Sequence, residues 1–247
     1  MKFVDIVTVT GADDSTDIKQ LLALAKDFPH VEFGILLSKD HMGHTRFPSS
    51  EWLGRFIDEA ADQNLNISGH LCGAWVRDLL KGSWPHQHLN GIHPKFTAPG
   101  VFKRWQINTH GTPHKTKHEA VVGIVQYLQG LNQTVIFQYD NVNTLALLKA
   151  KEAGCANIAT LYDLSHGAGV LPATWPAPLP GIRCGYAGGL TPENAAGQLA
   201  KLENLVGDTT VWIDAETWLR SHDGLIFDLK KVRAFLTAAQ PFVKTAP

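Results

Sequence analysis

Cysteine is scarce in this chain of 247 residues, which has one each at positions 72, 155 and 184. The three lie far apart in the sequence and none belongs to a Cys-x-x-Cys pair, so a disulfide framework is not expected. Cys155 and Cys184 are expected to be small residues of the core.

An excess of charge of one sign is also lacking. The formal net charge is −1 and no run of basic residues occurs, which argues against nucleic acid or an anionic membrane as the main partner. No apolar segment approaches the ~20 residues of a membrane span, and the first residues, MKFVDIVTVTGADD, lack the pattern of a signal peptide. We therefore expect a cytoplasmic protein that acts on a small molecule. The sequence does not indicate an oligomeric state.

What the sequence does contain is a regular alternation of short apolar runs and amphipathic segments. The runs are nearly all hydrophobic, as expected for strands of a parallel sheet with both faces covered. We predict strands at residues 3–9, 31–37, 66–72, 104–109, 134–140, 157–163, 184–189 and 210–216.

Each predicted strand is followed by a helix or, in one place, by a loop. The spacing of apolar residues predicts a loop at 164–181 and helices near 14–28, from Ser49 or Ser50 onward, and at 74–80, 116–129, 142–153, 192–206 and 227–239. In the 192–206 helix we expect Thr191 as N-cap and Pro192 at the first helical position.

Eight strand–helix units in about 250 residues are typical of a (β/α)8 barrel. We therefore predict an α/β protein with a single barrel domain over residues 1–247, and a doubly wound open sheet is the alternative. The segment 81–103 contains Gly, Pro, Trp and several histidines. It is expected to be an insertion that forms a lid.

In such a barrel the active site lies at the carboxyl ends of the strands. Polar residues stand at nearly all of these ends, which a purely structural barrel would not need. The candidates are Thr8, His70, Cys72, Asn108, Asp163, the pair Gly188 and Gly189, and the segment DAET at 214–217.

Four segments, in order along the chain, resemble phosphoribosylanthranilate isomerase, a barrel enzyme of the tryptophan pathway. They are GILLSKDHMGHTRFPSSEW (34–52), LYDLSHGAG (161–169), YAGGLTPENA (186–195) and WIDAETWLRSHDGLIFDLKKVRAFL (212–236). The third is similar to the phosphate motif of that family.

The resemblance implies an isomerase that converts an N-linked phosphoribosyl arylamine to a ketose by an Amadori rearrangement. Such an enzyme uses one general acid and one general base and needs no cofactor. The resemblance implies Asp163 as the acid, Arg46 as the partner of a substrate carboxylate, and Gly188 and Gly189 as the phosphate cradle.

The general base does not match the family. Thr8 stands where the family has a cysteine, and a threonine hydroxyl cannot act as an unaided base. His70 and Cys72 are the candidates, because residues two apart in a strand point to one face. Thr8 and Asn108 are expected to contact the substrate.

The end of the eighth strand is a second departure, because the family has a small glycine-containing loop there. Glu216 would lie close to a phosphate dianion, which is unfavourable unless the carboxylate turns away or is protonated. We expect Glu216 to be a catalytic partner of Asp163. Asp214 and Thr217 are expected to bind substrate, and Arg220 could supply positive charge.

The leading prediction is thus a cofactor-independent isomerase of a phosphorylated sugar derivative, with a substrate different from that of the family. One alternative is a barrel lyase, aldolase or hydrolase. A metal could then be bound by His70, Cys72 and His110, although their spacing is not a metal signature and no metal is part of the main prediction. The other alternative is a non-catalytic barrel that binds a phosphorylated ligand.

Overall fold

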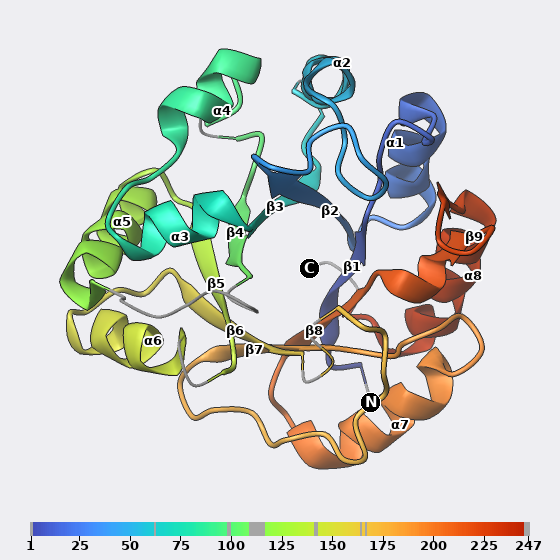
Figure 1. Cartoon of the computed structure of the whole chain (residues 1–247). Helices are drawn as coiled ribbons and strands as arrows, with labels where there is room; N and C mark the ends of the chain where they lie inside the picture. The colour runs from blue at the N-terminus through green and yellow to red at the C-terminus, as the bar shows by residue number, and fades with distance from the viewer. Residues whose placement is uncertain are drawn as a thin grey trace.

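The centre of the molecule is a closed barrel of eight parallel strands, as Figure 1 shows. The computed structural model describes residues 2–61, 63–97, 100–108, 117–140, 143–163, 165 and 167–244. The strands are β1 (Val4–Thr10), β2 (Val31–Ser38), β3 (Asn66–Cys72), β4 (Arg104–Ile107), β5 (Thr134–Gln138), β6 (Ile158–Asp163), β7 (Arg183–Ala187) and β8 (Val211–Ala215). The ring closes because Thr8 of β1 pairs with Glu32 of β2 on one side and with Asp214 of β8 on the other. The barrel prediction is confirmed, and the open sheet is wrong.

Helices surround the barrel on the outside. In the described part of the chain they are α1 (Ile18–Asp27), α2 (Ser50–Ala60), α3 (Ala74–Leu80), α4 (His86–Ile92), α5 (His118–Gly130), α6 (Asn143–Glu152), α7 (Ala195–Val206) and α8 (Leu229–Ala239). None of these described helices has the length and apolar composition needed to cross a membrane.

Side-chain caps set several helix starts, because they satisfy backbone N–H groups that have no partner within the helix. Asp17 accepts from the amide of Gln20 before α1, and Ser49 accepts from the amide of Trp52 before α2. The start of α7 differs from the prediction. Thr191 Oγ1 accepts from two amides, at residues 193 and 194, and this closes a turn, so that the helix begins only at Ala195.

The segment 81–103 contains α4, which the sequence pattern did not predict. Phe102 stacks on Phe96 and on Trp105 of β4, both with ring centroids 4.9 Å apart. His93 Nε2 lies 3.1 Å from the Asp58 carboxylate on α2. These contacts hold the described part of the insertion against the outside of the barrel, beside α2. Its role as a lid stays a prediction.

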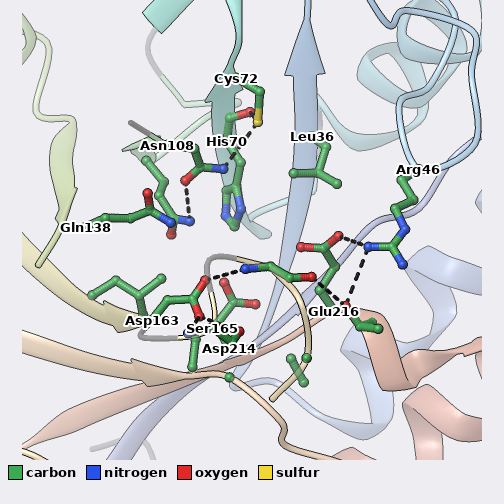
Figure 2. Close-up of a pocket in the computed structure, with 18 of the residues that line it drawn as sticks. Leu36, Arg46, His70, Cys72, Asn108, Gln138, Asp163, Ser165, Asp214 and Glu216 are labelled. Atoms are coloured by element: carbon green, nitrogen blue, oxygen red, sulfur yellow. Dashed lines mark hydrogen bonds and ion pairs between the residues drawn. The ribbon is translucent and has the colours of Figure 1, made fainter. Parts of the chain in front are cut away.

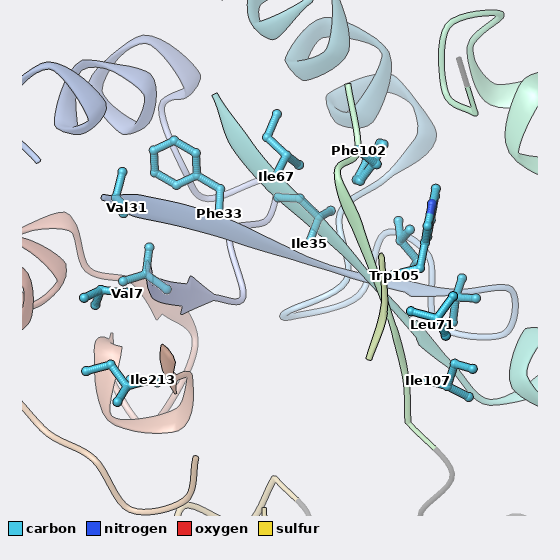
Figure 3. Packing of buried hydrophobic residues seen from close by; sticks show 14 of the residues in the cluster. Val7, Val31, Phe33, Ile35, Ile67, Leu71, Phe102, Trp105, Ile107 and Ile213 are labelled. Carbon is cyan, nitrogen blue, oxygen red and sulfur yellow. The ribbon is translucent and has the colours of Figure 1, made fainter. Parts of the chain in front are cut away.

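Alternate residues of the strands face the helices and form the main core. Figure 3 shows this layer with Phe33 and Ile35 on β2 and Ile67 and Leu71 on β3. The interior of the barrel has a smaller apolar cluster on the side of β5 to β8, made of Ile136, Ala159, Leu161, Ala187 and Trp212.

The other side of the interior is polar near the amino ends of the strands. Arg104, at the start of β4, binds both carboxylate oxygens of Glu32 on β2, at 2.6 Å and 2.5 Å. Thr8 donates to Glu32 at 2.9 Å, and the Arg104 guanidinium lies 4.5 Å from the centre of the Trp212 ring. We call Thr8, Glu32, Arg104 and Trp212 the lower lumen.

Burial opposes ionisation of Glu32, but the adjacent Arg104 charge and hydrogen bonds outweigh that effect and lower the pKa of Glu32. The lower lumen therefore holds a paired carboxylate and guanidinium.

Candidate active site at the carboxyl ends of the strands

A cavity of about 310 Å³ opens at the carboxyl ends of the strands. Residues from β2 to β8 and the loops after them line it, and Figure 2 shows their side chains converging. The polar lining comprises Arg46, His70, Cys72, Gln106, Asn108, Gln138, Asp163, Ser165, Asp214, Glu216 and Thr217. Most of the predicted site residues therefore come together here.

Asp214 is the last residue but one of β8 and is 6% exposed. Its Oδ1 accepts a hydrogen bond of 2.7 Å from the hydroxyl of Thr10. Burial raises the pKa of Asp214 well above its ordinary value, and three carboxylates, Glu216, Glu32 and Asp163, raise it further. The hydrogen bond from Thr10 offsets only part of this rise, so the surroundings of Asp214 favour its neutral carboxylic acid form.

Glu216 lies two residues beyond Asp214, and its side chain is 24% exposed. Burial also raises the pKa of Glu216, although its ion pair with Arg46 partly offsets the rise. Arg46 Nη1 lies 2.9 Å from Glu216 Oε1 and 3.5 Å from Thr217 Oγ1. Arg46 thus links the loop after β2 to the loop after β8.

A backbone hydrogen bond holds the Arg46 segment in place. Arg46 has a φ of 75°, and its amide donates to Asp13 Oδ2 at 2.7 Å. The same carboxylate accepts from Arg220 at 2.6 Å. Arg220 is fully buried, donates to backbone carbonyl groups as well, and does not line the cavity. It does not contact the cavity, but its positive charge still lowers the pKa of Glu216, so the sequence-based suggestion that Arg220 supplies positive charge stays a prediction.

His70 and Cys72 both line the cavity from one face of β3, as their spacing predicted. Burial lowers the pKa of His70 to about 4, and its Nε2 is hydrogen-bonded to Ser68 Oγ at 3.0 Å. Burial raises the pKa of Cys72 to about 12, against the effect of a 3.3 Å hydrogen bond from Asn108. Near neutral pH the first is a neutral imidazole and the second a thiol, which disfavours Cys72 as the general base.

Asp163, at the end of β6, binds the loop that follows it. Its Oδ1 accepts from the amide and the hydroxyl of Ser165, at 3.1 Å and 2.8 Å, and its Oδ2 accepts from the amide of Gly167 at 3.1 Å. The carboxylate that the family resemblance assigns as the acid is thus an acceptor for three donors of its own chain. Its role in proton transfer stays a prediction.

Gly188 and Gly189 follow β7 and line the cavity, with φ values of 104° and 65°. Thr8 is the candidate that the structure places elsewhere, because it binds Glu32 in the lower lumen and does not line the cavity. His110 lies outside the described residues. Among the described residues, no group of three His, Cys, Asp or Glu side chains is arranged to hold a metal ion.

Three contributors were missed by the sequence analysis: Asp13, which positions Arg46, and the amides Gln106 and Gln138. Gln106 alternates with apolar residues in β4, so period-two spacing was a usable signal for it, whereas Gln138 ends the continuous apolar run of β5. Gln106 Nε2 donates to Asn108 Oδ1 at 2.9 Å, which extends the polar wall of the cavity.

Neither a protein-family model nor a curated protein matches this chain. Solved structures do match. The 3-hexulose-6-phosphate synthase of Salmonella typhimurium is 8% identical with a TM-score of 0.52, and the match covers 96% of this chain and 100% of that one. The 3-keto-L-gulonate-6-phosphate decarboxylase of Vibrio cholerae is 10% identical with a TM-score of 0.52, covering 97% and 99%. The BexX/CysO complex of Amycolatopsis orientalis is 13% identical with a TM-score of 0.50, covering 99% and 96%.

At these identities the likeness establishes the barrel fold. It gives no specific support to the resemblance to phosphoribosylanthranilate isomerase. The prediction of an isomerase is contradicted, because the matched phosphosugar enzymes are a synthase and a decarboxylase. The predicted alternative of a barrel lyase fits these findings better. The physical reason for the error is that the glycine pair and the strand-end aspartate are features that barrels of different chemistry share.

Proposed function

We propose that this protein is a lyase that breaks or forms a carbon–carbon bond in a hydroxylated carbonyl compound by acid–base catalysis. The observation that carries the proposal is the pair of carboxyl groups with raised pKa values, Asp214 and Glu216, in one cavity at the carboxyl ends of the barrel strands. The names of the matched synthase and decarboxylase support this reaction class.

Asp214 is the general acid in this proposal. Thr10 occupies its Oδ1, which leaves Oδ2 to carry the proton. A carboxylic acid that stays neutral near pH 7 can donate a hydrogen bond to a carbonyl oxygen and then the proton itself.

Glu216 is the general base. A raised pKa makes its carboxylate a stronger base than an exposed one, and the ion pair with Arg46 favours the ionised form and fixes its orientation. The two roles need different protonation states. They are compatible because the pKa of Asp214 is raised further by the charge of Glu216 itself.

The step is a retro-aldol cleavage. Glu216 takes the proton of the hydroxyl group on the β-carbon, and that oxygen forms the new C=O of an aldehyde as the bond between the α- and β-carbons breaks. The electron pair of that bond forms the C=C of an enol, while Asp214 protonates the oxygen of the original carbonyl. Protons and electrons balance, and the reverse sequence forms the bond. No lysine is among the described residues that line the cavity, so none of them supplies a Schiff base.

The test is a coupled aldehyde-release assay on a panel of ketoses and 2-keto-sugar acids with the wild type and Asp214→Asn. We expect the substitution to lower kcat by about 10²- to 10³-fold, because the amide lacks the proton to donate. Asp208→Asn, an exposed loop carboxylate, is the matched control and keeps the wild-type rate.

The pH profile gives a second readout. Activity falls as the pH drops through the pKa of Glu216, because the base becomes protonated. It also falls as the pH rises through the pKa of Asp214, because the acid is lost. Unchanged turnover in Asp214→Asn contradicts the assignment of the acid. Tight sugar binding without cleavage contradicts the lyase and favours a ligand-binding barrel.

A further inference from the structure

The place where a phosphate would sit at the end of β7 contains part of the chain itself. A Cβ atom at Gly189 would collide with the backbone of Leu171, and one at Gly188 would lie 3.2 Å from the carbonyl oxygen of Val170. The two glycines therefore allow the loop after β6 to lie directly against the β7 turn. We call residues 167–171 the β6 loop segment.

The β6 loop segment is also fastened on its other side. Thr217 Oγ1 donates to the carbonyl of Gly167 at 3.1 Å, and Trp218 Nε1 donates to the carbonyl of Gly169 at 2.7 Å. Asp163 accepts from the amide of Gly167. The segment thus bridges the loops after β7 and β8, between which an anion would have to lie.

The amides of the turn that precedes α7 are already bonded within the chain. The amides of Glu193 and Asn194 donate to Thr191 Oγ1, and the amide of Thr191 donates to Asn194 Oδ1. Asn194 Nδ2 in turn donates to the carbonyl of Gly189. These donors are not directed at a ligand, unlike those of a phosphate-binding helix terminus.

The charges of the cavity also disfavour a bound phosphate. Asp163 and Glu216 line it as carboxylates and Asp214 as the proposed neutral acid, whereas Arg46 is the one lysine or arginine in the described lining and is paired with Glu216. A phosphate dianion in this cavity would lie close to the carboxylates of Asp163 and Glu216, and like charges repel. The opposite wall carries the neutral amides of Gln106, Asn108 and Gln138, which donate and accept hydrogen bonds.

We propose that the ligand of this cavity is an uncharged, hydroxyl-rich carbonyl compound, and that the β6 loop segment excludes the phosphate esters that the matched enzymes are named for. The proposal rests on the proposed function for the reaction and on the packing of residues 167–171 for the selectivity. Neutral amides and a protonated carboxyl group bind hydroxyl groups without any charge on the ligand.

The test is calorimetric titration of the wild type with matched pairs, D-ribulose and D-ribulose 5-phosphate, and D-fructose and D-fructose 6-phosphate, together with inorganic phosphate. We expect a free sugar to bind at least about tenfold more tightly than its phosphate ester, and inorganic phosphate not to bind at millimolar concentration. Tighter binding of the esters, or no binding of any free sugar, overturns the proposal.

Asp163→Asn tests the electrostatic part, because it removes one cavity charge with little change in shape. It should reduce the preference for the free sugar several-fold, whereas Asp208→Asn at an exposed site should leave it unchanged. Since the substitution also alters the cap of the β6 loop segment, the same titration is repeated at higher salt. Screening should reduce the preference of the wild type as well. A preference that neither Asp163→Asn nor salt alters overturns the electrostatic account.

The outcomes separate the two proposals. Free sugars that bind but are not cleaved leave the ligand class standing and contradict the lyase. Phosphate esters that bind tightly and are cleaved leave the lyase standing and contradict the ligand class. If inorganic phosphate binds to the wild type and does not bind to Gly189→Ala, the glycine pair is a phosphate cradle and the proposed ligand class is contradicted.

Discussion

The two ends of the barrel interior bury carboxyl groups to a similar extent but shift their pKa values in opposite directions. Glu32 in the lower lumen is 1% exposed and Asp214 in the upper cavity is 6% exposed. Arg104 lies against Glu32 and lowers its pKa, whereas among the described residues no cation contacts Asp214, and its pKa rises. The difference teaches that the nearest counter-charge, and not burial alone, decides whether a carboxyl group in this barrel is part of the structure or is available for chemistry.

The largest expected effect concerns the lower lumen. Arg104→Met leaves Glu32 buried without its partner, and we expect this to lower the free energy of unfolding by about 3–5 kcal/mol at pH 7. The measurement is urea denaturation followed by circular dichroism. The double variant Arg104→Met/Glu32→Gln removes both charges and should be more stable than the single variant. If the double variant is the less stable of the two, the pair is not an isolated ionic unit and the comparison between the two ends fails.

The sequence was sufficient to predict the barrel, because strands covered on both faces are short apolar runs and the eight runs alternate with helices. It was also sufficient to bring His70, Cys72, Asp163 and Asp214 to one end, since a residue at the carboxyl end of a barrel strand can only lie at that face. These inferences use local periodicity and topology alone.

The rest depends on contacts between segments far apart in the sequence. Asp13 is 207 residues from Arg220 and 33 from Arg46, yet it binds both. The two glycines after β7 were likewise interpreted from their local sequence as a phosphate cradle. In the structure, the group that lies where their side chains would be is the backbone of residues 170 and 171. A local pattern shows that a close approach occurs there, but it does not identify the group that approaches.

A smaller effect distinguishes the two carboxyl groups by the pH dependence of stability. The pKa of Asp214 is raised in the folded state, so its contribution to stability is fully present below the unfolded pKa of about 3.9 and is lost as the pH rises towards the folded pKa. Between pH 5 and 7, the free energy of unfolding of Asp214→Asn should therefore rise relative to that of the wild type by up to about 1.4 kcal/mol for each pH unit. Urea denaturation at each pH measures the difference.

For Glu32→Gln, the stability difference from the wild type should change with pH in the opposite direction. The folded pKa of Glu32 is lowered, so its contribution is present above the unfolded pKa and is lost as the pH falls through the folded pKa. The stability advantage of the wild type over Glu32→Gln should therefore shrink on acidification. Parallel pH profiles for the two variants would show that the counter-charge does not set the states of the two groups.

The smallest expected effect extends the comparison to a thiol of the upper cavity. Within the described part of the chain no cation lies beside Cys72, and burial raises its pKa to about 12, in the same direction as that of Asp214. At pH 7.5 the thiolate fraction is then about 10³-fold lower than that of a cysteine with an ordinary pKa. Alkylation of the native protein by iodoacetamide, followed at position 72 by mass spectrometry, should be slower by a similar factor than alkylation of the urea-unfolded chain. Rapid native labelling at Cys72 would mean that a thiolate forms in the cavity, and Cys72 would then compete with Glu216 for the role of the base.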